Sequence, residues 1–360
     1  MTDQGTRPGV PAQSPPVEPK TAHDGPPPPR RSWWSGDAAE PVRRNLGLIG
    51  VLVVLVIIGA VTRPELYGDA TWVTSNVWTI LQQASAIGVV TVGMTFVIIG
   101  GGIDLSVGAI VAVAGVWSTT LATQSYGAAG MIFTAIVVGV VVGLINGVLI
   151  SYGKLVPFIA TLAMMVAARG LAAMISDKQT QVSTNSTING IASTKVAGVP
   201  MLVIILALVV AAGWVLLNRT TFGRRTVAVG GNVEAARLAG INVRVHTVLL
   251  YALSGLCCGI AAIMLTSQAT SAQAAMANLY ELDAIAAAII GGTLLSGGRG
   301  TIIGALFGVL VFSTITNLFA INNLSTEVQN MVKGGIIVAA VLVQQFHYRS
   351  LTQLFGRKPA

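Results

Sequence analysis

Few residues in this sequence have the type and spacing that catalysis or metal binding needs. The three His lie at positions 23, 246 and 347, too far apart to have metal-ligand spacing. Cys257 and Cys258 are adjacent inside an apolar run, a pattern typical of small hydrophobic residues in a helix rather than of a disulfide or a metal site. The acids outside the N-terminal region belong to no recognisable catalytic motif. We therefore expect no catalytic residue and no metal site.

The more informative polar residues lie inside apolar stretches, where a charge is costly and is usually retained for function. This argument gives three charged candidates for a translocation pathway, Asp104, Glu281 and Asp283. Gln82, Gln83 and Asn146 are added as uncharged hydrogen-bonding groups of the type that a passing polar substrate needs. Asp104 follows three successive Gly in GGIDLSVG, and together with Ser106 it could equally cap the next helix. Glu281 and Asp283 could equally pair with Lys333, and uncharged polar residues also join membrane helices. The sequence leaves these structural roles open beside the functional one.

The elements that must position these residues lie in lipid. Of 360 residues, 53% are hydrophobic and only 9% are charged, whereas an average soluble protein has roughly 25% charged residues. These values exclude a soluble globular protein and, because disordered chains are poor in apolar residues, a wholly disordered one. Spans long enough to cross about 30 Å of hydrocarbon are predicted over 46–62, 76–99, 103–122, 128–150, 155–176, 198–217, 246–269, 282–297, 301–320 and 328–346. The predicted fold class is an all-α polytopic integral membrane protein with about ten transmembrane helices.

Glycine, with 41 residues, is abundant in these stretches, and we interpret most of it as a packing feature. Gly139, Gly143 and Gly147 are four residues apart on one face of the fourth span, so a neighbouring helix is expected to approach closely there. The eighth span is short and rich in Gly, which favours a broken or re-entrant helix. A weak internal similarity relates 93–109 to 291–305, and because both follow a span running inward it favours a parallel repeat.

The distribution of basic residues predicts the orientation of the chain. Residues 1–44 hold ten of the 14 Pro, with six basic and five acidic residues, which predicts a disordered Pro-rich cytoplasmic tail rather than a secretory signal. With ten crossings, ten basic residues of the remainder fall inside and three outside, which predicts both termini in the cytoplasm. The expected organisation is therefore this tail, a transmembrane domain over 45–346 and a cytoplasmic C-terminal tail over 347–360.

One polar segment between spans, residues 219–246, holds five Arg and a single acid and is therefore predicted to lie in the cytoplasm. Gly230 and Gly231 predict a turn, and Asn232 is a good cap for a short helix over 233–239. A two-turn amphipathic helix between two membrane spans is more than a connector needs. The segment either anchors the topology or docks a cytoplasmic partner.

This segment contains TTFGRRTVAVGGNVEAARLAGINV, which closely resembles the cytoplasmic coupling loop of the permeases of ribose-type, carbohydrate-importing ABC transporters. Three more stretches agree in the expected order: GGIDLSVG at 101–108, GLINGVLISYGKLVPFIATLAMM at 143–165, and YELDAIAAAIIGGTLLSGGRGTIIGALFG at 280–308. The resemblance covers about residues 75–345. It implies that the loop couples to an ATPase, with Glu234 and Arg237 making polar contacts across the interface. The implied coupling residues are Gly223, Arg224, Arg225, Gly230, Gly231, Asn232, Glu234, Ala235 and Arg237.

The resemblance also implies the setting in which the chain works. It implies a multi-pass permease subunit of the bacterial cytoplasmic (inner) membrane that translocates a pentose, a hexose or a related small polyol. The implied partners are a second permease copy or a homologue in a dimer, cytoplasmic ATP-binding-cassette subunits and an extracytoplasmic sugar-binding protein. No nucleic-acid partner is expected.

The energy source is expected outside this chain. Its only Gly-Lys pair, Gly153–Lys154, lacks the upstream Gly of a P-loop and is followed by Leu. ATP and magnesium are therefore expected in the partner ATPase, and we expect this chain to be neither an enzyme nor the holder of a cofactor. The alternatives are a stand-alone secondary sugar transporter or channel and, without a motif to favour it, a membrane-embedded enzyme or assembly scaffold.

Overall fold

The computed structural model describes the backbone of residues 40–355 and the side chains of residues 44–342. Most of the predicted Pro-rich tail, up to residue 39, lies outside the described residues. The described chain is mostly helical, as predicted. Its helices are α1 (Glu40–Thr62), α2 (Pro64–Tyr67), α3 (Ala70–Ile99), α4 (Val107–Ser118), α5 (Leu121–Gln124), α6 (Gly127–Ser151), α7 (Pro157–Ile175), α8 (Ser186–Gly190), α9 (Met201–Arg219), α10 (Thr221–Gly231), α11 (Val233–Leu238), α12 (Val243–Ala269), α13 (Tyr280–Ile290), α14 (Ile302–Ile321) and α15 (Thr326–Phe355).

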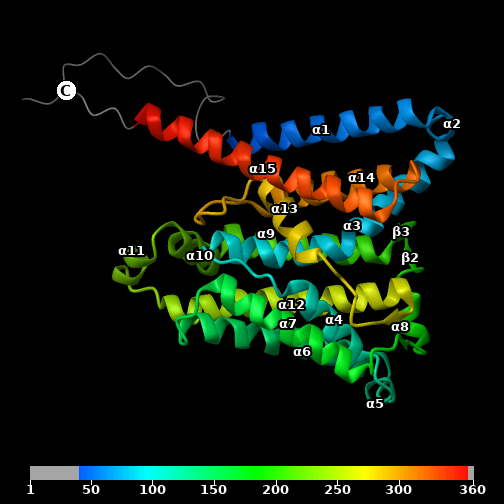
Figure 1. The fold of residues 1–360 in the computed structure, drawn as a ribbon, viewed down its shortest axis with the longest axis horizontal. Helices are drawn as coiled ribbons and strands as arrows, with labels where there is room; N and C mark the ends of the chain where they lie inside the picture. Colours follow the sequence, from blue (N-terminus) through cyan, green and yellow to red (C-terminus); the bar gives the residue numbers. More distant parts are fainter. Residues whose placement is uncertain (1–39, 356–360) are drawn as a thin grey trace, which may run out of the picture. The chain divides into compact units, whose positions relative to one another are not determined.

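Short strands connect some of the segments between helices. The strands are β1 (Gln181–Val182), β2 (Lys195–Val196), β3 (Val199–Pro200) and β4 (Ser271–Ala272). β1 pairs antiparallel with β4, which joins the segment after α7 to the segment after α12, and β2 and β3 form a hairpin before α9. This hairpin lies with α2 at one end of the helical bundle, whereas α10 and α11 lie at the opposite end (Figure 1).

Seven helices in the described part of the chain are long and apolar enough to cross a membrane: α1, α3, α6, α7, α9, α12 and α14. They cover seven of the ten predicted spans, and α15, whose side chains are described only as far as Leu342, covers the tenth. The third and eighth spans differ, because α4 has 12 residues and α13 has 11. At 1.5 Å per residue these helices are only about 17–18 Å long, which is less than the hydrocarbon thickness. The prediction of a full-length helix over 103–122 is therefore wrong. The helix of the eighth span is short, in agreement with the short Gly-rich stretch in the sequence.

Local contacts at both ends explain why α4 is short. Gly101 has a φ of +84°, a left-handed conformation that ends the preceding helix. The Asp104 carboxylate then accepts a hydrogen bond from the backbone N–H of Ser106 at 3.0 Å, which delays the helix start. At the other end, the Thr119 hydroxyl donates to the carbonyl of Gly115 at 3.0 Å. Residues 100–106 consequently form a non-helical break between α3 and α4.

The core of the bundle is formed by α3, α4 and α12. Nearly every residue from Ala84 to Ile99 in α3 is buried, as is almost all of α4. Cys257 and Cys258 are free and buried in α12, as expected of small hydrophobic residues. Helix α1 instead exposes most of its apolar side chains, which is the pattern of a helix that faces lipid. The charged candidate residues near the core are therefore shielded from lipid by other helices.

The close helix approach predicted from the glycines of the fourth span is confirmed. Their neighbour is α12, which contributes glycines of its own. A Cβ atom at Gly139 would lie 3.1 Å from the Cα of Gly259, and one at Gly143 would lie 3.2 Å from the Cα of Gly255. Gly147 meets the backbone of α12 in the same way. Because no larger residue fits on this face, α6 and α12 pack backbone against backbone.

Candidate functional site

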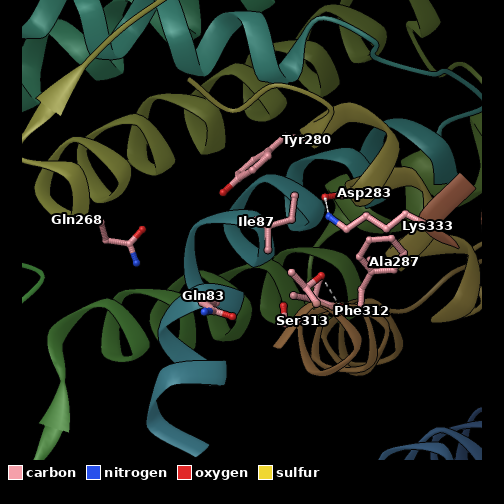
Figure 2. A pocket seen from close by; sticks show the side chains of 11 residues that line it. Gln83, Ile87, Gln268, Tyr280, Asp283, Ala287, Phe312, Ser313 and Lys333 are labelled. Carbon is pink, nitrogen blue, oxygen red and sulfur yellow. Dashed lines mark hydrogen bonds and ion pairs between the residues drawn. The ribbon is translucent and has the colours of Figure 1, made fainter. Parts of the chain in front are cut away.

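A cavity of about 370 Å³ lies between α3, α12, α13, α14 and α15 (Figure 2). Its walls combine apolar side chains with amide, hydroxyl and charged groups, a composition typical of small-molecule sites. The lining residues are Gln83, Ile87, Gln268, Tyr280, Asp283, Ala287, Val309, Phe312, Ser313, Thr316 and Lys333. Of the six predicted pathway residues, Gln83 and Asp283 line this cavity.

An ion pair forms part of the cavity wall. The Lys333 ammonium group lies 3.1 Å from a carboxylate oxygen of Asp283 and 5.4 Å from the centre of the Phe312 ring (Figure 2). The two side chains are 19% and 14% exposed, so each charge depends on the other for most of its stabilisation. The pair leaves this wall without net charge. Pairing with Lys333, one of the roles that the sequence allowed for Asp283, is thus present.

Glu281 lies close to Asp283 in sequence but does not line the cavity. Its side chain is 6% exposed and faces α4, because a Cβ atom at Gly108 would lie 2.7 Å from its Oε2 atom. Arg169 of α7 donates to the carbonyls of Ala274 and Met276, both at 2.7 Å. Arg169 therefore fixes the segment that leads into α13, the helix that presents Asp283 to the cavity.

Asp104 and Asn146 meet in a second, fully buried cluster. Besides the Ser106 backbone, the Asp104 carboxylate accepts hydrogen bonds from the hydroxyls of Ser106 and Ser254, the latter at 3.0 Å. The Asn146 amide donates to the Ser106 hydroxyl at 2.8 Å. The cluster connects the break before α4 with α6 and α12, and none of its residues lines the cavity. Asp104 thus fixes Ser106, the residue before α4, and does not itself cap an N–H group of that helix. Ser254, an ordinary Ser in an apolar helix, gave no signal in the sequence.

The remaining candidate, Gln82, does not line the cavity, and its contact with the lining residue Gln268 is made by its backbone. Its carbonyl accepts a hydrogen bond from the Gln268 amide at 3.2 Å. Sequence reasoning missed four polar lining residues: Gln268, Tyr280, Ser313 and Thr316. Ser313 and Thr316 are three residues apart and therefore share a face of α14, a signal that was available. Gln268 and Tyr280 gave no comparable signal in the sequence, because they reach one cavity only through the packing of α12 and α13 on the same helix, α3.

The second candidate region is the projecting segment, residues 221–240, which holds α10 and α11 (Figure 1). The predicted short helix is confirmed as α11, and the Asn232 side chain caps it by accepting from the backbone N–H of Ala235 at 2.9 Å. The predicted turn at Gly230 and Gly231 is wrong, because α10 continues as a helix through both residues. Thr220 caps α10 at its start, and Gly230 in its last turn packs against Ile99 and Gly298.

Most of the predicted coupling residues lie on the surface of the projecting segment. Those that are exposed are Arg224, Arg225, Gly231, Asn232, Glu234, Ala235 and Arg237. Glu234 and Arg237 form an ion pair with each other on α11. The hydrogen bond and the charge of Glu234 raise the pKa of the Arg237 guanidinium. Gly223 is buried instead, because the end of α9 at Leu217 leaves no room for a side chain there.

Two apolar side chains of α11 were not singled out from the sequence. Val233 is 53% exposed and Leu238 is 79% exposed, one at each end of the helix. Of the residues of α11, only Ala236 faces the molecule and is buried, so both apolar side chains are accessible to a partner.

The chain is similar to membrane permeases over most of its length. The family model described as branched-chain amino acid transport system / permease component matches residues 76–341. The ribose import permease protein of Bacillus subtilis (strain 168) is 41% identical over 316 residues, covering 84% of this chain and 94% of that protein. The ribose import permease protein of Escherichia coli (strain K12) is 36% identical over 301 residues, covering 82% and 92%.

A third relative has a different sugar in its name. The galactofuranose transporter permease protein of Escherichia coli (strain K12) is 36% identical over 273 residues, covering 76% of this chain and 80% of that protein. No solved structure matches the chain. The range matched by the family model contains both the cavity and the projecting segment. The chain therefore belongs to the branched-chain amino acid transport system / permease component family.

Proposed function

We propose that this chain is the membrane-spanning permease subunit of an ABC importer that moves a monosaccharide or a related small polyol across the bacterial inner membrane. The observation that carries the proposal is the cavity. Its volume of about 370 Å³ is near the lower end of the range for ligand pockets, roughly 300–1,000 Å³, and suits a single sugar ring. Gln83, Gln268, Ser313 and Thr316 offer amide and hydroxyl groups that bond sugar hydroxyls. The relatives' names support the same substrate class.

The charges of the cavity favour a neutral substrate. The carboxylate of Asp283 already neutralises the ammonium group of Lys333. Neither side chain is therefore free to bind a charged group of the substrate. A zwitterionic amino acid would have to break this pair, whereas a sugar can bond to it without separating the charges. The family description includes amino-acid permeases, and the paired charges of this cavity support the sugar substrates over them.

The projecting segment supports a role in coupling to an ATPase. Arg224, Arg225, Glu234 and Arg237 are exposed for polar contacts, and Leu238 supplies an apolar contact. In this proposal a second permease copy or a homologue completes the membrane unit, an extracytoplasmic binding protein delivers the sugar, and cytoplasmic ATP-binding-cassette subunits bind ATP and magnesium. Rigid-body movement of the helices follows closure of the ATPase.

We further propose ten crossings with both termini in the cytoplasm. The third and eighth crossings combine a short helix with a non-helical segment, 100–106 before α4 and 291–301 after α13. Such breaks are tolerated at membrane depth where other helices surround them. A membrane-impermeant thiol reagent tests this topology. Applied from outside, it should label Lys178→Cys and leave Lys154→Cys unlabelled; the reverse pattern would contradict the orientation.

Reconstitution tests the function. Proteoliposomes with this chain, its ATPase and its binding protein should take up labelled ribose or galactose only when ATP is present, and the chain alone should neither hydrolyse ATP nor transport. Uptake by the chain alone in response to an ion gradient would instead identify a secondary transporter. Replacing the binding protein with buffer is the matched control, because the importer requires delivery of the sugar.

A further inference from the structure

Two helix breaks and the projecting segment meet at a set of glycines. The first break, residues 100–106, separates α3 from α4, and the second, residues 291–301, separates α13 from α14. The backbone N–H of Gly298 donates to the carbonyl of Ile99 at 2.8 Å, which joins the two breaks. Gly230, in the last turn of α10, packs against both: a Cβ atom there would overlap the Ile99 carbonyl oxygen and lie 2.7 Å from the Gly298 nitrogen.

The other contacts of this glycine junction, which consists of Gly101, Gly230, Gly297 and Gly298, also join backbone to backbone. A Cβ atom at Gly297 would lie 2.8 Å from the carbonyl oxygen of Gly230 and 3.0 Å from the Cα of Gly101. Gly101, Gly297 and Gly298 have φ values of +84°, +83° and +75°, which disfavour any other residue. Since no side chain separates the three segments, no rotamer change can absorb a shift of one against another.

Each break leads directly to polar groups inside the bundle. The first break contains Asp104 and its buried cluster, and it follows α3, which carries Gln83 on the cavity wall. The second break follows α13, which carries Asp283 on the same cavity. The Arg44 guanidinium of α1 also donates to the Gly292 carbonyl in the second break at 3.1 Å, so this break is held from a further side. A displacement at the junction is therefore transmitted to both breaks.

We propose that Gly230 is a positioning residue for transport, through which movement of the projecting segment reaches both helix breaks and, through them, the cavity wall. This inference rests on the proposed function as an importer subunit. It differs from simple docking, because the docking surface of α11 is exposed whereas Gly230 faces the bundle. At the adjacent Gly231 only the backbone approaches Gly298, and a Cβ atom there would have no atom within 4 Å.

A helical glycine elsewhere in the chain gives a matched control. A Cβ atom at Gly170 of α7 would have no atom within 4 Å, and Gly170 is not one of the predicted coupling residues, so Gly230→Ala and Gly170→Ala are the same substitution in a helix with and without a contact. In the reconstituted transporter, Gly170→Ala should retain both ATP hydrolysis and uptake. Gly230→Ala should retain ATP hydrolysis but take up about tenfold less sugar per ATP hydrolysed, because the methyl group separates the segments. Equal uptake per ATP in the two variants would overturn the proposal.

A measurement on the unmodified transporter serves if Gly230→Ala does not assemble. Backbone hydrogen exchange is followed with and without magnesium and a non-hydrolysable ATP analogue. Exchange in peptides covering 98–102 and 296–300 should change together with exchange in 228–234. Unchanged exchange in either break overturns the inference. The proposed function is judged separately, because failure of the unmodified complex to take up sugar with ATP would refute it whatever the variants do.

Discussion

The cavity and the glycine junction are built in opposite ways. Side chains from five helices form the cavity, with space between them and with exposed polar groups such as Gln83. The junction consists of backbone atoms from three segments, with no room for a single methyl group at Gly230. The side chains of the cavity can change rotamer to fit a ligand, whereas the junction can only move as a unit. Binding of a substrate in the cavity thus requires polar side chains, whereas transmission of a movement through the junction requires glycine.

The largest expected effect in this comparison is at the ion pair of the cavity. Lys333→Met leaves Asp283 as an unpaired, largely buried charge and should destabilise the protein by about 3–5 kcal/mol. The double variant with Asp283→Asn should recover most of this loss, because neither charge remains. Thermal unfolding in nanodiscs, arranged as a double-mutant cycle, measures both. A double variant as unstable as the sum of the single ones would show that the two groups act independently.

The next largest effect is expected at the buried Asp104 cluster. Asp104→Ala removes the acceptor of the Ser106 backbone and of the Ser254 hydroxyl, at a cost of about 1–3 kcal/mol in the free energy of unfolding. Asp104→Asn keeps an acceptor oxygen and should lose less. Because the cluster does not line the cavity, the KM for sugar uptake by the assembled transporter should stay unchanged. A raised KM with unaltered thermal stability would place Asp104 on the sugar pathway.

A smaller effect is expected on the surface of the projecting segment. Leu238→Ser should weaken ATPase binding about tenfold, or roughly 1.4 kcal/mol, because it removes an exposed apolar contact without touching the fold. Leu121→Ser, at the 85% exposed Leu121 of α5, is the control and should leave binding unchanged. Co-purification at increasing dilution measures the affinity. Equal binding by both variants would exclude α11 as the contact.

The smallest effect is expected at a single amide of the cavity. Gln83→Ala should raise the KM for the sugar a few-fold, about 1 kcal/mol, through the loss of one hydrogen-bonding group. Gln82→Ala is the matched control, because the Gln82 side chain does not line the cavity. Uptake at varied concentrations of the loaded binding protein gives the KM. A stronger effect of Gln82→Ala would mean that the pathway passes on the other side of α3.

Much of the fold follows from local features of the sequence. Apolar stretches placed the seven described helices that are long enough to cross a membrane, Asn232 marked the start of α11, and the four-residue spacing of Gly139, Gly143 and Gly147 marked a close helix approach. The short α4 was not predicted, because its ends depend on the Asp104 and Thr119 side chains rather than on hydropathy. Hydropathy indicates the length of the segment that prefers lipid, but it does not show at which residue the helix begins.

The candidate site was less predictable than the fold. Gln83 and Asp283 were identified because polar residues are conspicuous in apolar stretches, but the same argument joined them to Asp104 and Asn146, which lie in another cluster. Ser254 and Gln268 have no distinguishing feature in the sequence, and only helix packing brings them beside Asp104 and Gln82, respectively. Residue type thus indicated which side chains were unusual, whereas their grouping required the contacts between helices.

By itself, the sequence determined the membrane environment, the positions of the long apolar helices, the cap of α11 and the basic character of the segment between α9 and α12, because these depend on neighbouring residues and on transfer to lipid. Only the tertiary structure decided that Gly230 continues a helix instead of making a turn, since the space it occupies is set by Ile99 and Gly298. The same holds for the partner of the glycine face on α6 and for the grouping of polar residues around the cavity. These features depend on contacts between residues far apart in the chain, for which local patterns carry no signal.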